Sequence, residues 1–197
     1  MKFLKNSIFL SMIIWPALVI LTITGIGCSS DIEPLKGNLA RVEMKISRTG
    51  KDFVPICYGV FVSPEYVLIT RHFIDLAGQF LVNGVPARIQ YVWDDLDLLL
   101  LETEANPKFI KIKTGNLSIG SPVFTLAERN GFIYWVNAGT IKEIFFERII
   151  LSDFCAESGE SGKPVFTQTG EFVGIIQASW EFSETHLIPA NRCFQKD

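Results

Sequence analysis

The residues of this chain that could carry out covalent chemistry are a serine, a histidine and an aspartate that lie far apart in the sequence. Ser161 lies in the glycine-rich stretch GESGKP, which precedes an apolar strand pattern. A serine hydroxyl is a poor nucleophile at neutral pH, so it needs an imidazole to accept its proton and a carboxylate to orient that imidazole. His72 and Asp97 could supply these groups, although each of the three also has an ordinary structural explanation.

The choice of histidine and aspartate rests on their neighbours. The chain has two histidines: His186 lies on the apolar terminal stretch THLIPA, whereas His72 follows YVLIT at a strand-to-turn junction, where its ring can face a cleft. Asp94, Asp95 and Asp97 precede the buried run LLLLE. Asp97 is preferred as the orienting acid, because choosing Asp95 instead would place Asp97 at a buried position of the strand.

The elements that must position these residues have the pattern of short strands. Apolar segments such as ARVEMKI, YGVFVS and RIILSDF are separated by Gly, Pro and Asn, and QFLVNGVPARIQYVW indicates a hairpin through Asn83-Gly84. Helix signals are weak after the N-terminal segment. The pattern predicts an all-β, mostly antiparallel domain over residues 38–197, built as two small barrels at about 38–117 and 118–197.

The N-terminal segment predicts export. Lys2 and Lys5 precede an apolar run of about 20 residues that ends at Cys28, which is typical of a signal peptide over residues 1–28 but is also long enough to cross a bilayer uncleaved. The small residues before Cys28 resemble a bacterial lipobox, which implies lipidation of Cys28. Lipoprotein, signal anchor and plain secretion all export the rest of the chain, with residues 29–37 as a tether.

The remaining cysteines and the charge balance restrict the partners. Cys57, Cys155 and Cys193 permit at most one disulfide, whose pairing stays open, and each is expected to be a buried small hydrophobe. Their long spacings contain no C-x-x-C pair, so no metal site is expected. The net charge of −3 comes without a basic stripe, which argues against a nucleic-acid partner.

Three segments together resemble the chymotrypsin-fold serine proteases. GVFVSPEYVLITRHF is similar to the strand, Ser-Pro turn, strand and histidine of that family, DLLLL to its aspartate segment, and GESGKP to its Gly-x-Ser-Gly-x-Pro. The resemblance implies two antiparallel six-stranded barrels, with His72 as general base, Asp97 as orienting acid and Ser161 as nucleophile. It also implies an oxyanion hole formed by the backbone N–H groups of Gly159 and Ser161.

Within that fold, the chain resembles more closely the protease domain of the bacterial HtrA (Deg) enzymes. Ser152-Asp153 precedes the serine as in that group, and GEFVGIIQAS followed by HLIPANR is similar to its last two strands. The chain stops at Asp197, so no PDZ domain is expected. The resemblance implies a membrane-tethered, extracytoplasmic endopeptidase that acts on proteins or peptides without a cofactor, and it leaves homo-oligomerisation open.

The resemblance also suggests a primary specificity pocket. By spacing from Ser161, its base should be Cys155, and its wall should come from Ile176, Gln177, Ala178 and Ser179. These residues carry no charge. The predicted pocket therefore favours small or medium apolar side chains.

Departures from the family pattern around His72 keep a second function open. Ile69 stands where the family has Thr or Ser, and Thr70 and Arg71 stand where it has small residues. Lys163 replaces a glycine after the Ser-Gly pair, which bears on substrate fit more than on activity. A chain disabled at this site could be a pseudoprotease or a chaperone-like module that holds an extended peptide by strand addition. The presence of all three catalytic residue types argues against that alternative.

Overall fold

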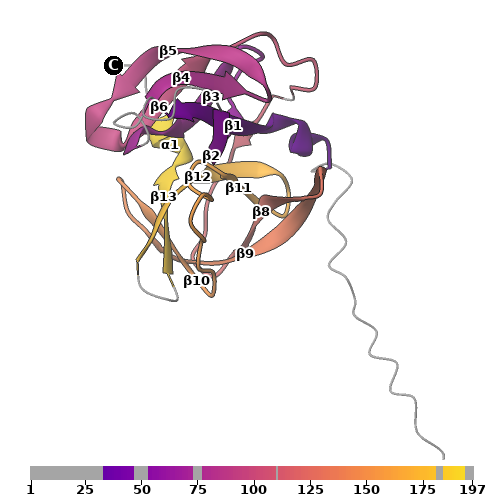
Figure 1. Ribbon diagram of the computed structural model, residues 1–197. Coiled ribbons are helices and arrows are strands. Elements are labelled where there is room, and N and C mark those ends of the chain that lie inside the picture. The colour runs from indigo at the N-terminus through magenta and orange to yellow at the C-terminus, as the bar shows by residue number, and fades with distance from the viewer. Residues whose placement is uncertain (1–32, 47–52, 73–76, 110, 181–183, 194–197) are drawn as a thin grey trace, which may run out of the picture.

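The computed structural model describes residues 33–46, 53–72, 77–109, 111–180 and 184–193. The elements of its first half are η1 (Glu33–Asn38), β1 (Leu39–Ile46), β2 (Phe53–Phe61), β3 (Tyr66–Thr70), β4 (Ala77–Val82), β5 (Val85–Trp93), η3 (Asp94–Leu96) and β6 (Leu98–Glu102). The strands pair in the order β1-β2-β3-β6-β5-β4 and close into a barrel (Figure 1). The predicted Asn83-Gly84 hairpin is confirmed, since Val82 pairs with Val85 and both turn residues have positive φ.

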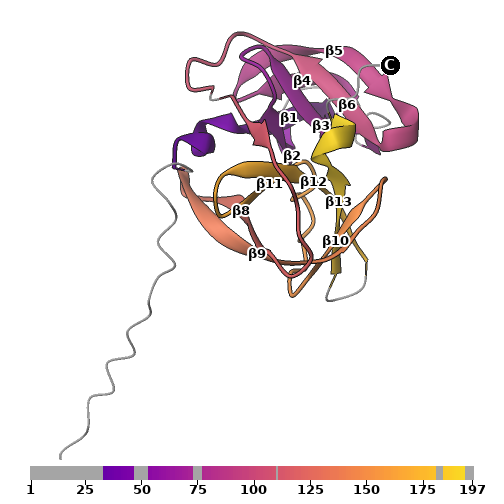
Figure 2. The same ribbon diagram turned by 180° about the vertical axis from the view of Figure 1, so that it is seen from behind.

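The second half forms another barrel. Its elements are β7 (Lys113–Thr114), β8 (Pro122–Arg129), β9 (Phe132–Ile144), β10 (Ile149–Ser152), β11 (Pro164–Thr167), β12 (Glu171–Trp180), β13 (Glu184–Pro189) and α1 (Ala190–Cys193). The order is β11-β8-β9-β10-β13-β12, and the pairing of β11 with β12 closes it. The prediction of two six-stranded antiparallel barrels is therefore confirmed. Strand β7, in the connection that Figure 2 shows between the barrels, adds a short parallel pairing to β12.

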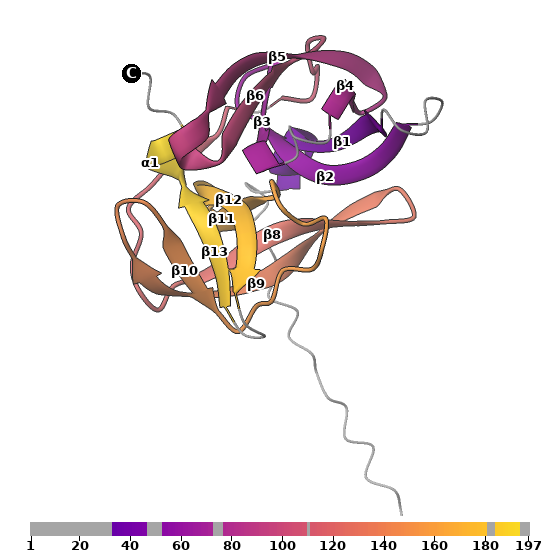
Figure 3. The same cartoon turned by 60° about the vertical axis from the view of Figure 1, so that its left-hand side comes forward.

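Three apolar clusters hold this arrangement together. One fills each barrel, and the third lies between them, where Val60 and Leu98 of the first barrel join Phe166 and Ile188 of the second. Helix α1 extends from the end of β13 toward the first barrel (Figure 3) and contributes Cys193 to the third cluster. The cleft between the barrels is thus fixed by a shared apolar core.

The N-terminal part of the described chain is packed against this body. In η1, Leu35 is buried in the cluster between the barrels, and Asn38 donates a hydrogen bond to the carbonyl of Phe61. Leu35 and Asn38 therefore pack against the folded body, while the bounds of the tether and of the domain stay predictions. The predicted signal or anchor and Cys28 lie outside the described residues, and no helix in the described ranges is long and apolar enough to span a membrane.

The cysteines are free thiols in the part of the chain that the structure describes. Cys57 and Cys193 are buried, as expected, and burial raises the pKa of each thiol, which keeps both protonated and inert. Cys155 is exposed, so the expectation of a buried small hydrophobe is wrong for this residue. It lies in the loop after β10, where no strand covers it.

Candidate active site

The pairing of β3 with β6 brings His72 and Asp97 together. These strands are antiparallel and adjacent, with Thr70 opposite Leu98. Because His72 follows the end of one strand and Asp97 precedes the start of the other, the two residues emerge at the same edge of the barrel. Nδ1 of His72 lies 3.0 Å from Oδ2 and 3.3 Å from Oδ1 of Asp97.

Backbone contacts fix Asp97 in this position. The residue ends η3 with a left-handed backbone (φ 55°, ψ 36°), a conformation that Asp tolerates better than most residues. Its carbonyl accepts a hydrogen bond from Arg71 N at 2.7 Å, and its Oδ1 accepts one from His72 N at 2.9 Å. The aspartate thus orients the main chain as well as the ring of the histidine.

The carboxylate of Asp97 has a third partner from the other barrel. Nε2 of Gln177, on β12, donates to Oδ2 of Asp97 at 3.2 Å. Burial raises the pKa of Asp97, but the hydrogen bonds and charge of His72 and the hydrogen bond from Gln177 lower it by more, so the pKa lies below its ordinary value. The carboxylate is therefore ionised at neutral pH and can stabilise a protonated His72.

Ser161 is presented by a tight turn before β11. Gly162 has φ +86°, and a Cβ at this position would clash with the carbonyl oxygen of Tyr58, so only glycine fits. Gly162 N donates to the carbonyl of Ile176 at 2.7 Å, and Tyr58 N donates to the carbonyl of Ser161 at 3.3 Å. The hydroxyl of Ser161 donates to the carbonyl of Gln177 at 3.1 Å.

One cavity of about 880 Å³ between the barrels contains all three residues. Its lining comprises His72, Asp95, Leu96, Asp97, Glu147, Arg148, Ala156, Glu157, Ser158, Ser161, Gln177, His186, Ile188 and Arg192. A hydroxyl, an imidazole and an ionised carboxylate that meet in one cavity can carry out nucleophilic acyl transfer. No cluster of three potential metal ligands occurs within the described ranges.

Three other residues that the sequence singled out take different positions relative to the cavity. The carboxylate of Asp95 is 77% exposed and lies 3.8 Å from the guanidinium of Arg192. The guanidinium of Arg71 pairs with Asp94 at 2.6 Å, and Arg71 is not among the residues that line the cavity. His186 lines the cavity from the middle of β13, a position that its apolar flanking sequence did not reveal.

The residues predicted to form the specificity pocket do not all line the cavity. Of its five residues, Gln177 lines the cavity, whereas Ile176 is buried inside the second barrel and Cys155 is exposed outside the lining. The side chains of Ala178 and Ser179 lie outside what the structure describes. The lining of the whole cavity is mostly polar, with charges from both barrels.

A buried threonine supports the loop beside Ser161, and no sequence signal pointed to it. Thr185, fully buried on β13, donates from its hydroxyl to the carbonyl of Phe154 at 2.8 Å and accepts from Ala156 N at 3.1 Å. These bonds attach the loop after β10 to the sheet. A threonine on an apolar strand is typical of an ordinary β pattern, so its role depends on the tertiary fold.

Comparisons with known proteins agree with this fold. The sequence model described as the trypsin-like peptidase domain matches residues 57–175. No curated protein matches the chain.

Three solved structures are similar in fold. A serine endoprotease from Yersinia pestis has a TM-score of 0.69 at 21% identity, covering 83% of this chain and 62% of that one. The MamO protease domain from Magnetospirillum magneticum, in its apo form, has a TM-score of 0.67 at 19% identity, covering 84% and 99%. A protease from M. tuberculosis in its active form has a TM-score of 0.67 at 16% identity, covering 80% and 78%.

Proposed function

Because the chain belongs to the trypsin-like peptidase domain family, which makes it a serine endopeptidase by family, we propose that Ser161, His72 and Asp97 form its catalytic triad. The observation that carries this proposal is the 3.0 Å contact between Nδ1 of His72 and Oδ2 of Asp97 in the cavity that Ser161 also lines. The order of these residues along the chain, His72, Asp97 and Ser161, is the order that the resemblance to the chymotrypsin-fold proteases implies.

The proposed reaction proceeds through an acyl-enzyme. Oγ of Ser161 attacks the carbonyl carbon of the scissile peptide bond while Nε2 of His72 accepts the hydroxyl proton. His72 then gives this proton to the leaving amine, and the acyl group stays on Ser161. Water, deprotonated by His72, attacks the ester carbonyl, and the protonated His72 returns the proton to Oγ of Ser161 as the new carboxyl end is released. Asp97 holds Nδ1–H of the imidazole and stabilises its charged form throughout.

The developing negative charge needs donors of its own. In this proposal the backbone N–H groups of Gly159 and Ser161 form the oxyanion hole. The positive φ of Gly159, +90°, supports this role, because such a backbone turns successive N–H groups toward one side of a loop.

One hydrogen bond of Ser161 is compatible with the alternative function, in which the domain binds peptides without cutting them. The hydroxyl of Ser161 donates to the carbonyl of Gln177, so in the proposed reaction it must leave this acceptor and turn to His72. The proposal therefore requires a rotation about the Cα–Cβ bond of Ser161. A chain in which the hydroxyl stayed on Gln177 would bind extended peptides in the cleft without cutting them.

The proposed setting is outside the cytoplasm, with the domain held at a membrane by its N-terminal segment. Support comes from Lys2 and Lys5, the apolar run and Cys28. Cys28 is either lipidated or part of an uncleaved anchor, and labelling with a palmitate analogue distinguishes the two. The proposed substrates are proteins or unfolded peptides, as the resemblance to the HtrA enzymes implies.

The direct test compares the full chain with its Ser161→Ala variant. Both are incubated with unfolded casein and, separately, with a fluorophosphonate probe that reacts with activated serines. Cleavage and labelling by the wild type that both vanish in the variant support the proposal. If the folded wild type neither cuts nor reacts, the triad is not catalytic in this chain, and binding of the casein would then favour the alternative.

A further inference from the structure

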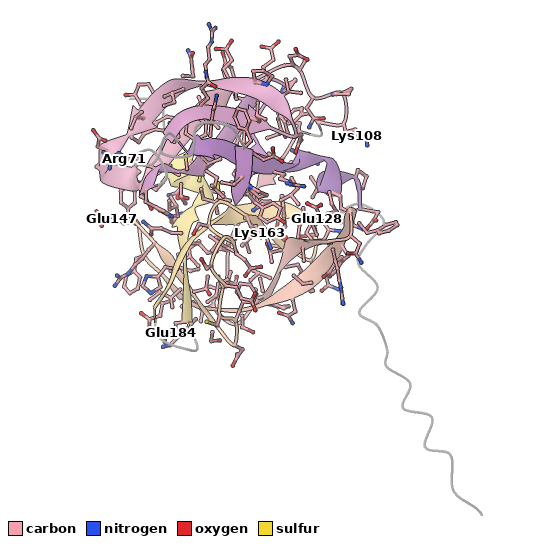
Figure 4. The ribbon with its side chains drawn as sticks, viewed as in Figure 1. Arg71, Lys108, Glu128, Glu147, Lys163 and Glu184 are labelled. Atoms are coloured by element: carbon pink, nitrogen blue, oxygen red, sulfur yellow. The ribbon has the colours of Figure 1, made fainter. Side chains whose placement is uncertain are left out.

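A buried lysine lies directly behind the turn that carries Ser161. The ammonium of Lys163 bonds to Oε1 of Glu160 at 2.6 Å, and the two side chains are only 5% and 21% exposed. The same ammonium lies 4.7 Å from the ring centroid of Tyr58 on β2, which is a cation–π contact. Figure 4 shows Lys163 where the two barrels meet.

The carboxylate of Glu160 also holds the first part of the turn. Its second oxygen accepts a hydrogen bond from Glu157 N at 2.8 Å, while Glu160 N donates to the carbonyl of Glu157 at 3.1 Å. Lys163 N in turn donates to the carbonyl of Glu160 at 3.1 Å. Glu160, the residue immediately before Ser161, is therefore tied to both ends of the segment 157–163.

The far end of this segment is fixed to the second barrel. Ile176 N, on β12, donates to the carbonyl of Lys163 at 2.9 Å. The ammonium of Lys163 faces Tyr58, so the lysine links its turn to strands of both barrels. Burial, followed by the charge of Glu128, raises the pKa of Tyr58, which keeps the ring neutral beside the ammonium.

The ion pair between Glu160 and Lys163 is not expected to add to the free energy of unfolding. Removing two charges from water carries a large desolvation cost, so an apolar pair of similar volume would stabilise the fold at least as well. What this pair adds is position, because a charge that is largely out of water has to stay beside its partner. The ammonium of Lys163 is held between Glu160 and Tyr58, so the residues on either side of Ser161-Gly162 are tied to each other and to the first barrel.

We propose that Glu160 and Lys163 are positioning residues for the proposed reaction: their buried ion pair fixes the turn so that the N–H groups of Gly159 and Ser161 meet the substrate carbonyl. This inference rests on the proposed function. It also gives a role to the lysine that departs from the family pattern. The ammonium of Lys163 lies against Glu160 and Tyr58 and its side chain is 5% exposed, so the lysine acts on the turn and not by direct contact with substrate.

The test measures kcat and KM of the full chain for a peptide substrate in three variants, Lys163→Met, Glu160→Gln and the double variant. We expect each single variant to lower kcat about 100-fold, the size of the loss when one oxyanion donor is misplaced, with KM changed less than about threefold. The rate of fluorophosphonate labelling should fall in parallel. The double variant should be no worse than either single variant, because the pair acts as one unit.

A matched control uses the exposed ion pair between Lys142 and Glu184, which joins β9 to β13 away from Ser161. Lys142→Met makes the same change of charge and should leave kcat unchanged. Thermal unfolding is recorded for every variant. If Lys163→Met does not fold, the double variant carries the test, since it leaves no unpaired buried charge.

Two outcomes would overturn the inference. If the wild type cuts and the folded Lys163→Met or double variant keeps its kcat within about twofold, the pair is only structural, and the proposed function stands. If the wild type has no Ser161-dependent activity, the proposed function and this inference fail together.

Discussion

The two barrels deliver their parts of the site in different ways. The first barrel places His72 and Asp97 at the ends of two paired strands, so the strand register itself brings the groups together. The second barrel presents Ser161 on a turn whose shape depends on a glycine with positive φ, a buried ion pair and contacts with both barrels. Register is set by many ladder bonds, whereas the turn depends on a few contacts. In the proposed triad, the acid–base half (His72 and Asp97) should therefore tolerate substitution around it better than the nucleophile half (Ser161).

The largest effect is expected from Asp97→Asn. The amide keeps the shape of the side chain but favours the wrong tautomer of His72, so kcat should fall on the order of 10⁴-fold. The temperature of unfolding should also fall, because the ionised carboxylate that accepts hydrogen bonds from His72 and Gln177 stabilises the fold. Peptide hydrolysis kinetics and thermal unfolding measure the two effects. Asp95→Asn is the matched control, because Asp95 is exposed and paired with Arg192. A larger loss in the control would mean that Asp95 is the orienting acid.

The next effect concerns the turn of the nucleophile half. Gly162→Ala should lower the free energy of unfolding by about 3 kcal/mol, because the new Cβ meets the carbonyl of Tyr58 and the backbone is left-handed. Gly131→Ala separates the two causes: Gly131 has φ +78° and no atom within 4 Å of the added Cβ, so about 1 kcal/mol is expected. Urea denaturation measures both. Equal losses would contradict the steric part of the argument.

A smaller effect is expected from the hydrogen bond that links Gln177 of the second barrel to Asp97 of the first. Gln177→Leu removes the amide that bonds Asp97, and kcat should fall about tenfold, since a hydrogen bond to a charged group contributes about 1.5 kcal/mol. The stability from ionised Asp97 is present above its ordinary pKa and is lost as the pH falls through its lowered folded pKa. In the variant that folded pKa rises, so acid unfolding should begin at higher pH. An unchanged acid transition would argue against the contact.

The smallest effect is expected from Arg71→Ala. The ion pair of Arg71 with Asp94 is exposed, so its loss should cost less than about 1 kcal/mol, and kcat/KM should stay within about twofold. This variant tests whether the departure from small residues before the histidine impairs the site. A marked gain or loss of activity would show that Arg71 acts on His72.

What the sequence could predict differs between the strands of the site and its loops. The strand pattern and the hairpin at Asn83-Gly84 are local properties of the sequence, whereas the proximity of His72 to Asp97 depends on the pairing of β3 with β6 and was predicted from the resemblance. Cys155 was predicted at the pocket base by spacing from Ser161, but the path of the loop decides which side chains face the cavity.

The contacts that sequence reasoning missed are non-local. The hydrogen bond of Gln177 to Asp97 joins residues 80 positions apart, and the hydroxyl of Thr185 reaches a loop 31 residues earlier. Neither residue type carries a signal on an apolar strand. The partner of Lys163 was three residues away, so the ion pair with Glu160 could have been found from spacing. Its burial could not, because that depends on Tyr58 from the other barrel.

The apolar cluster between the barrels has a consequence for synthesis of the chain. It includes Ala190 and Cys193 of α1 beside Leu35 of η1, so the two extremes of the described chain meet in it. A domain that emerges from the ribosome N-terminus first can close its first barrel early. The cleft that contains His72 and Ser161 gains its full support only after residues 190–193 have emerged. A nascent chain therefore completes this cleft only after both barrels have been synthesised.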